Sequence, residues 1–433
     1  MSKAGTCWGL SFPVPARRRS RPATNTDVTS STTDAPGRLL HVRIRFVRIS
    51  QRRRSRMPRV CHVSFTGWPQ VPIFSDRSRS TKMSTMHGQK VLITGGSGFI
   101  GSYLAMALLK KGEHVVLFDR DPDLRRITGF GAQFEPFKKQ LTFVQGDISL
   151  LAHTLAVFDK HEPKGVFHLG ALLSAGAESN PTMGFQVDLV GTWNVLEATR
   201  LYCQHRNAAP IKVMFPSTIA SFGSFIAPGQ KVKNEDVQMP TTMYGTSKVA
   251  VERLGEYYSA QARQWVDFRA VRFPSVLGAA RGPGGTTVYS TLMIQEPLLG
   301  KAYEAYVAED TRLDILYVKD AIEALMQLHD ADPATLRRRV YNIAGIRSGD
   351  QAPSAAEIKA AVEKIAGPGA ITFKVNQTLS DIVHTFGILD DSAAREDWGW
   401  KGASFNLDQT VADFKAELDA FPDRIKAIEL FGA

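Results

Sequence analysis

Residues 91–101 read VLITGGSGFIG, and this stretch decides the fold of the chain. Its first three residues form a short apolar run of the kind found in buried parallel strands. The glycine-rich residues that follow have almost no side-chain bulk, and apolar residues then recur at helical spacing over 99–110. A strand, a tight turn and a helix N-terminus together predict an anion site, because backbone N–H groups and the helix dipole point at one place.

The three glycines of this turn have separate expected roles. Gly95 permits the tight turn, Gly98 lets backbone approach a pyrophosphate, and Gly101 lets the helix lie close to the sheet. Residues 114–119 (HVVLFD) predict a second strand that ends in Asp119, about 20 residues after the turn, where a carboxylate accepts hydrogen bonds from an adenosine ribose. The pattern therefore predicts a dinucleotide site, with NAD favoured over NADP. Arg120 is the open alternative, since a guanidinium there can hold a 2′-phosphate.

The positive charge of the chain is concentrated at its N-terminal end. The net charge is +11, and residues 1–87 hold 17 Lys and Arg against three acids, so the remainder is mildly acidic. The leader fits a mitochondrial transit peptide, a disordered basic tail, or an extension that is not translated because Met83 and Met86 precede the first strand. The body thus predicts no nucleic-acid partner, and no apolar run reaches membrane-span length. With Cys203 the only body cysteine, the location is cytoplasmic or mitochondrial.

Strand and helix patterns alternate through the body. Further strands are predicted at 141–144, 165–169, 211–215 and 266–272, and helices at 150–160, 185–201 and 244–264. This alternation predicts an α/β fold, a Rossmann-like doubly wound parallel sheet with a smaller mixed α/β substrate lobe. The expected domains are the leader 1–87, an NAD-binding domain 88–275 that the chain rejoins near 340–345, and a lobe formed mostly by 276–433.

The lobe has weaker signals. They predict a strand at 313–318, a helix capped by Asp320 and ending near 329, a strand at 340–343, a helix at 355–365 and a strand at 371–375. No histidines cluster with cysteines at ligand spacing, so no metal site is predicted.

Polar residues at strand ends are the candidate binding groups, because open α/β sheets bind ligands there. Asp147 follows the third strand, where it can bind an adenine amino group or cap the next helix. Ser174 lies beyond the fourth strand, after the small residues Gly170 and Ala171. His168, within that strand, is interpreted as a packed core histidine.

Thr218, Tyr244 and Lys248 form the candidate catalytic group. Tyr244 and Lys248 are four residues apart in a predicted helix and therefore share one face. A tyrosine can take the proton of a secondary alcohol if its pKa falls below its usual value, and a nearby lysine ammonium favours the phenolate. Thr218, at a strand end, can hold the substrate hydroxyl. Alternatively, the spacing of Tyr244 and Lys248 arises by chance on a surface helix.

The motifs TGGSGFIG (94–101), HLGA (168–171) and YGTSK (244–248), with Asp119, GDI at 146–148 and the pair Ser217–Thr218, resemble an extended short-chain dehydrogenase/reductase of the NAD-dependent epimerase/dehydratase type over about 89–420. The resemblance implies that Thr218, Tyr244 and Lys248 are catalytic. The residues it implies for cofactor binding are Gly95, Gly98, Phe99, Ile100, Gly101, Asp119, Asp147, Ile148, Leu169, Gly170, Ala171, Tyr244, Lys248 and Phe273.

Further stretches resemble the L-threonine 3-dehydrogenase branch, among them LLSAG (172–176), GGTT (284–287) and EDTRL (309–313). This resemblance implies Ser174, Thr218, Thr286 and Thr287 as substrate-binding residues. The chain departs from the branch pattern at Asp188, Val288 and Asp314, and in the RYPG stretch, which reads RFPS at 272–275 and so differs at Phe273 and Ser275. MIQEPLLG (293–300) is similar instead to sugar-acid dehydrogenases.

The expected activity is NAD-dependent oxidation of a secondary alcohol in an L-threonine-like 3-hydroxy amino acid or a sugar acid. The alternatives are a nucleotide-sugar 4-epimerase that retains its NAD and a non-catalytic NAD-binding regulator. Ile219 and Ala220 stand where related dehydratases carry an Asp-Glu pair, which disfavours dehydration. The expected partners are a small-molecule substrate and, as an option that the sequence leaves open, a second copy in a homodimer.

Overall fold

The computed structural model describes residues 29–34, 38–43, 88–223, 226–227, 229–262, 264–282, 284–285, 287–384 and 386–429. The chain separates into two compact units, 1–79 and 80–433. In the first, β1 (Thr29–Asp34) pairs with β2 (Arg38–Arg43) in antiparallel register. Disorder is predicted for the whole leader, including the residues of this strand pair; the other residues of the leader, 1–28, 35–37 and 44–87, lie outside the described residues.

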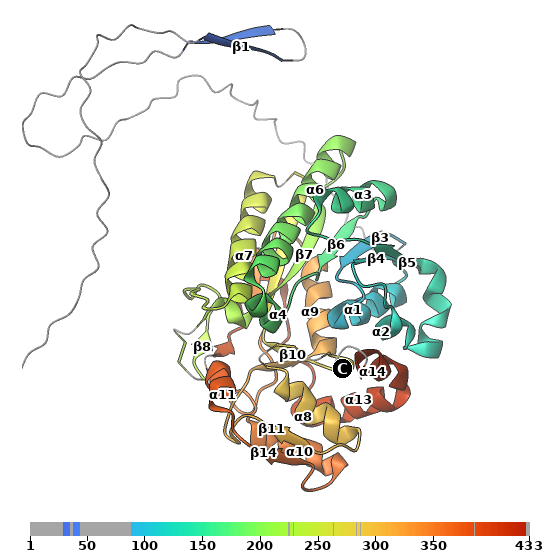
Figure 1. The fold of residues 1–433 in the computed structure, drawn as a ribbon, viewed down its shortest axis with the longest axis vertical. Helices are drawn as coiled ribbons and strands as arrows, with labels where there is room; N and C mark the ends of the chain where they lie inside the picture. The colour runs from blue at the N-terminus through green and yellow to red at the C-terminus, as the bar shows by residue number, and fades with distance from the viewer. Residues whose placement is uncertain are drawn as a thin grey trace, which may run out of the picture. The chain divides into compact units, whose positions relative to one another are not determined.

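A seven-stranded sheet forms the centre of the second unit, and all its pairings are parallel. Its order is β13-β9-β7-β6-β3-β4-β5. The strands β7, β6, β3, β4 and β5 are labelled in Figure 1. The strands are β3 (Lys90–Thr94), β4 (His114–Asp119), β5 (Leu141–Gln145), β6 (Gly165–His168), β7 (Ile211–Thr218), β9 (Val266–Phe273) and β13 (Val340–Asn342). The α/β Rossmann-like fold is confirmed, and the glycine turn follows an inner strand rather than an edge strand.

Helices cover both faces of this sheet, which explains why its strands are apolar on both sides. One face carries α1 (Phe99–Lys110) and α9 (Val318–Asp330), and the other carries α3 (Leu151–His161), α6 (Gly191–Arg206) and α7 (Met243–Gln261). The helix predicted at 185–201 is divided, because η3 (Phe185–Val190) has π-helical hydrogen bonding before α6 begins.

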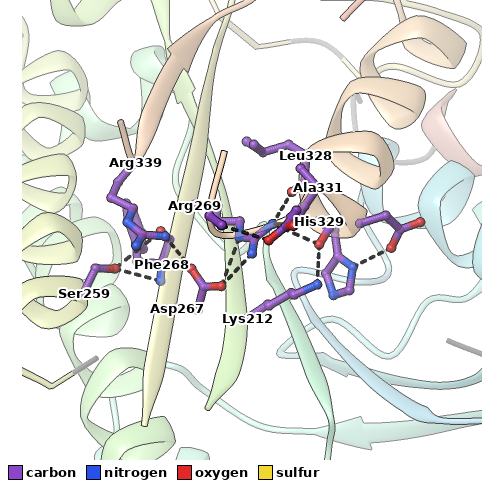
Figure 2. Close-up of polar contacts among 12 residues, drawn as sticks. Lys212, Ser259, Asp267, Phe268, Arg269, Leu328, His329, Ala331 and Arg339 are labelled. Carbon is purple, nitrogen blue, oxygen red and sulfur yellow. Dashed lines mark hydrogen bonds and ion pairs between the residues drawn. The ribbon is translucent and has the colours of Figure 1, made fainter. Parts of the chain in front are cut away.

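Figure 2 shows how a buried arginine fastens α9 to the sheet. Arg269 of β9 donates from Nη1 to the carbonyl oxygens of Leu328 and Ala331, both at 2.7 Å, and Lys212 of β7 donates to that of His329 at 2.7 Å. These cations satisfy carbonyl groups that the end of a helix leaves without intrahelical partners. Asp267 accepts from Arg269 and so balances part of the buried charge.

The remaining elements lie outside the central sheet. Short parallel pairs join β10 (Ser275–Leu277) to β12 (Ile315–Tyr317), β11 (Tyr303–Ala305) to β14 (Ile371–Phe373), and β8 (Lys231–Val232) to β15 (Ile388–Leu389). The larger helices here are α8 (Tyr289–Leu298), α10 (Ala355–Ala366), α13 (Leu407–Ala420) and α14 (Pro422–Glu429). Smaller helical segments are α2 (Arg125–Thr128), η1 (Gly131–Gln133), η2 (Glu135–Gln140), α4 (Ser174–Ser179), α5 (Pro181–Gly184), η4 (Ile219–Ser221), α11 (Gln377–His384) and α12 (Ser392–Trp398).

The cap predicted for Asp320 is wrong. Tyr317 is the N-cap of α9 and makes no side-chain cap bond, while the Asp320 carboxylate accepts instead from the N–H groups of Ser404 and Phe405. A tertiary contact 84 residues away therefore takes the acid that local sequence assigns to the helix end. Among the described helices, none is long and apolar enough to cross a membrane.

Candidate active site

One cavity of about 880 Å³ lies at the carboxyl ends of the parallel strands. It brings together every predicted site residue that the structure describes; Thr286 lies outside the described residues. The predicted residues in its wall are Gly95, Gly98, Phe99, Ile100, Gly101, Asp119, Asp147, Ile148, Leu169, Gly170, Ala171, Ser174, Thr218, Tyr244, Lys248, Phe273 and Thr287.

The glycine turn between β3 and α1 forms one wall. Gly95 has φ +67°, and a Cβ built on it would lie 2.6 Å from the backbone nitrogen of Gly170. A Cβ on Gly101 would lie 2.6 Å from the carbonyl oxygen of Gly95. The close approach at Gly101 is therefore between the helix and its own turn, rather than between helix and sheet as predicted. Bare backbone N–H groups at the start of α1 suit a phosphate.

Asp119 fixes the far edge of the cavity at the end of β4. Its carboxylate accepts from the backbone N–H of Ser97 at 3.0 Å and of Asp121 at 3.1 Å. Each oxygen keeps a second lone pair for a ribose hydroxyl. Asp147 accepts from Ser149 N–H at 2.8 Å, whereas Leu150 is the N-cap of α3, so the alternative of a plain helix cap for Asp147 is wrong.

The predicted catalytic group converges at the other end of the cavity. Thr218 ends β7, and its Oγ1 accepts from Ala220 N–H at 3.1 Å. Tyr244 lies in the first turn of α7, whose N-cap Thr242 accepts from Gly245 N–H, and its hydroxyl makes no hydrogen bond to a described residue. Lys248, one turn further along, is 4% exposed and its Nζ lies 5.3 Å from the centre of the Tyr244 ring.

Asp188 adds a negative charge behind this wall. Its Oδ1 accepts from Leu172 N–H at 2.7 Å, while Oδ2 is buried and has no partner among the described residues. Burial raises the pKa of Asp188, and Lys248 opposes that shift. Burial also lowers the pKa of Lys248 to about 8, against the effect of the Asp188 and Glu252 carboxylates.

The pKa of Tyr244 shifts in the direction opposite to the one predicted. Burial, and after it the Asp188 carboxylate, raise the pKa of the phenol above its usual value, while Arg281 lowers it. Desolvation disfavours the phenolate more strongly than one cation favours it. Proton removal therefore needs further positive charge beside the phenol.

The substrate candidates lie near this end of the cavity. Ser174 begins α4, and Thr287 Oγ1 is 2.8 Å from Ser275 Oγ. Sequence reasoning missed Arg281, which lines the same cavity. The sequence does contain a feature that could have identified Arg281: it is a basic residue that follows a strand and borders a glycine-rich loop.

His168 is a core histidine, as predicted. It is 1% exposed, and its ring nitrogens lie 2.6 Å from Thr94 Oγ1 and 2.8 Å from Thr192 Oγ1. Burial lowers its pKa to about 3, which keeps the ring neutral at physiological pH.

The cavity fits a dinucleotide. The glycine turn offers a cradle that a Cβ would fill at Gly95 and Gly101, and Asp119 stands at the ribose position of such folds. The same cavity is also lined by Thr218, Tyr244 and Lys248. Fold and site together define an NAD-dependent oxidoreductase of the Rossmann type.

Comparison with known proteins extends this assignment. The chain belongs to the NAD dependent epimerase/dehydratase family, whose model matches residues 91–344. It is 31% identical over 348 residues to the mitochondrial L-threonine 3-dehydrogenase of Bos taurus, covering 79% of this chain and 86% of that protein. It is 30% identical over 318 residues to an uncharacterized epimerase/dehydratase of Staphylococcus haemolyticus, covering 72% and 92%.

Solved structures agree with these relatives. The holo form of a GalE-like L-threonine dehydrogenase from Cupriavidus necator is 32% identical and superposes with a TM-score of 0.66. The match covers 76% of this chain and 99% of that one.

Proposed function

We propose that this protein is a dehydrogenase that oxidises a secondary alcohol of a small polar substrate with free NAD as acceptor. The observation that carries the proposal is the convergence of Thr218, Tyr244 and Lys248 in the wall that also contains the glycine turn. The names of the bovine and Cupriavidus relatives favour a 3-hydroxy amino acid, and a sugar acid is the other candidate substrate.

Each residue of the site would have a separate role in substrate binding, proton transfer or cofactor binding. Thr218 orients the substrate hydroxyl, and Tyr244 takes its proton. Lys248 binds a nicotinamide ribose hydroxyl and favours the phenolate. The glycine turn and Asp119 hold the pyrophosphate and the adenosine ribose. When bound, NAD would supply the hydride acceptor and the positive charge of its nicotinamide ring.

The leader and the assembly are further parts of the proposal. The Arg-rich composition of residues 1–87 and the mitochondrial relative favour import into mitochondria over a cytoplasmic location. The homodimer stays a prediction.

The test is a screen of NADH formation over 3-hydroxy amino acids, aldonic acids and nucleotide sugars. A dehydrogenase reduces free NAD in proportion to the substrate consumed. An epimerase retains its NAD, so nucleotide sugars would isomerise without net NADH, and that result would overturn the proposal. Tight NAD binding without conversion of any substrate would favour the non-catalytic regulator.

A further inference from the structure

Arg281 lies in the loop between β10 and α8, next to a residue with an uncommon backbone conformation. The residue before it, Ala280, has φ +67°, a left-handed conformation that is uncommon for a residue with a Cβ. Arg281 lines the cavity together with Ser174 and Tyr244. It lies close enough to Tyr244 for each side chain to shift the pKa of the other.

One edge of the guanidinium is fixed by the protein. Nη1 donates to the carbonyl oxygen of Val276 at 2.6 Å, to Thr291 Oγ1 at 3.2 Å and to Ser275 Oγ at 3.4 Å. The other nitrogens, Nε and Nη2, donate to no described residue. The arginine is thus held in place with donors left over, which is what recognition of a planar anion requires.

The spare donors border a small open space. A Cβ built on Gly285 would lie 3.7 Å from Arg281 Nη2 and 3.7 Å from Ser174 Oγ. A guanidinium and a hydroxyl therefore face the same point, and the glycine keeps that point free of a side chain.

The charge of Arg281 is not balanced by a described carboxylate. Within the described part of the chain, no carboxylate forms an ion pair with it. Glu178, which also lines the cavity, accepts from the backbone N–H of Met243 at 2.5 Å. Burial lowers the pKa of Arg281 to about 10, so the group stays charged at neutral pH in a place where its charge is costly. An anion bound there would offset that desolvation.

We propose that Arg281, with Ser174, binds the carboxylate of the substrate, so that this enzyme oxidises hydroxy acids rather than neutral alcohols or nucleotide sugars. The inference rests on the proposed dehydrogenase function and narrows its substrate class. A carboxylate on Arg281 places an attached 2- or 3-hydroxyl toward Tyr244 and Thr218. The residue acts in specificity and takes no proton.

The experiment compares acids with neutral counterparts in the wild type, Arg281→Met and Arg281→Lys. The pairs are L-threonine with L-threoninamide, D-erythronate with erythritol, and 3-hydroxybutyrate with butane-1,3-diol. In the wild type, NADH forms with at least one acid far faster than with its counterpart. Arg281→Met raises KM for that acid about 100-fold, and leaves KM for its neutral counterpart unchanged; kcat falls for both, because the phenolate of Tyr244 loses a nearby cation. Arg281→Lys recovers part of the loss, because it restores charge without the planar fork.

Arg126→Met is the matched control, since Arg126 lines the same cavity but has Asp121 and Asp123 as charged neighbours. It is expected to change KM for NAD rather than KM for the acid.

Calorimetric titration of NADH-loaded protein with 3-hydroxybutyrate, L-threonine and D-erythronate measures acid binding without turnover. The thermal midpoint of unfolding shows whether each variant is folded. If Arg281→Met does not fold, Arg281→Lys takes its place in the comparison.

The outcomes separate the two proposals. Equal turnover of acids and neutral alcohols, or a KM unaffected by Arg281→Met, overturns the role of Arg281 while the dehydrogenase stands. Arginine-dependent binding of an acid without NADH formation keeps the acid site and overturns the dehydrogenase. Absence of binding for every acid, together with absence of NADH formation from every acid and every neutral counterpart, overturns both.

Discussion

Lys248 Nζ donates a hydrogen bond to the carbonyl oxygen of Pro216 at 2.8 Å and lies 4.2 Å from the centre of the Phe215 ring. Both partners belong to β7, the strand that ends in Thr218. The same ammonium group therefore ties the helix that carries Tyr244 to the strand that carries Thr218. Since both elements are packed in the core, the distance between the two hydroxyl groups is set by the fold.

Replacement of this lysine tests its double role. Lys248→Met keeps most of the side-chain volume but loses the charge, so we expect KM for NAD to rise about 10-fold. The acid limb of the pH–rate profile should move to higher pH, because the phenolate of Tyr244 loses a stabilising cation. An acid limb that stays in place would show that Lys248 does not act on the tyrosine.

Tyr244→Phe removes the proposed base without disturbing the packing, because the hydroxyl bonds to no described residue. Turnover is expected to fall by about 100-fold or more, while NAD affinity measured by calorimetry stays close to that of the wild type. Tyr257→Phe is the control, since Tyr257 lies on the same helix and is 60% exposed. Near-normal turnover in Tyr244→Phe would mean that another group takes the proton.

Asp119 is expected to select NAD over NADP by repelling a 2′-phosphate. Asp119→Asn removes the charge and keeps one oxygen, which can accept from Ser97 N–H or from Asp121 N–H but not from both, because these N–H groups bond to different carboxylate oxygens. The ratio of kcat/KM for NAD to that for NADP should fall about 10-fold. Asp123→Asn should leave the ratio unchanged, because Asp123 pairs with Arg125 outside the cavity wall. Equal or better use of NADP by the wild type would show that Arg120 outweighs the carboxylate.

Asp188 raises the pKa of Tyr244, so its removal should have the reverse effect. Asp188→Asn keeps the oxygen that accepts from Leu172 N–H and loses the negative charge. Activity requires the deprotonated tyrosine, and a lower pKa therefore moves the acid limb of kcat/KM to lower pH, by about half a unit to one unit. Asp188 also raises the pKa of Lys248, so its removal lowers that pKa. A shift of the acid limb to higher pH would mean that the resulting loss of charge on Lys248 has the larger effect on the pKa of Tyr244.

Stability depends on the buried pair of Glu252 and Arg272. Arg272 donates from Nε at 2.9 Å and from Nη2 at 2.8 Å to the two carboxylate oxygens, and both side chains are almost fully buried. Glu252→Gln leaves a buried guanidinium without its counterion, so we expect the free energy of unfolding to fall by about 3–5 kcal/mol. Denaturant unfolding measures this, with Lys364→Ala as the control for an exposed pair, expected below about 1 kcal/mol.

The parts of this molecule that local sequence could predict are those in which a periodic pattern continues for several residues. The glycine turn, the strands that flank it and the one-turn spacing of Tyr244 and Lys248 belong to this group. The divided helix at η3 was not predicted, because apolar residues recur at similar positions in π- and α-helical turns. Arg281 was missed for another reason: its importance comes from Ser174 and Tyr244, which only the folded chain brings near it.

The contacts of Tyr103 in α1 have a consequence for the order of folding. Its buried hydroxyl donates to the Glu417 carboxylate of α13, 314 residues further along the chain, and to Ala279 O at 3.0 Å. The Arg424 guanidinium of α14 lies 4.2 Å from its ring. Within residues 88–433, α1 is among the first parts to leave the ribosome. Glu417, which accepts the hydrogen bond from Tyr103, is among the last. The NAD-binding domain therefore lacks this contact until synthesis is nearly finished. Contacts between residues so far apart in the sequence also slow folding. A premature stop before residue 417 would leave this helix without its partner and expose the nascent protein to chaperones and proteases.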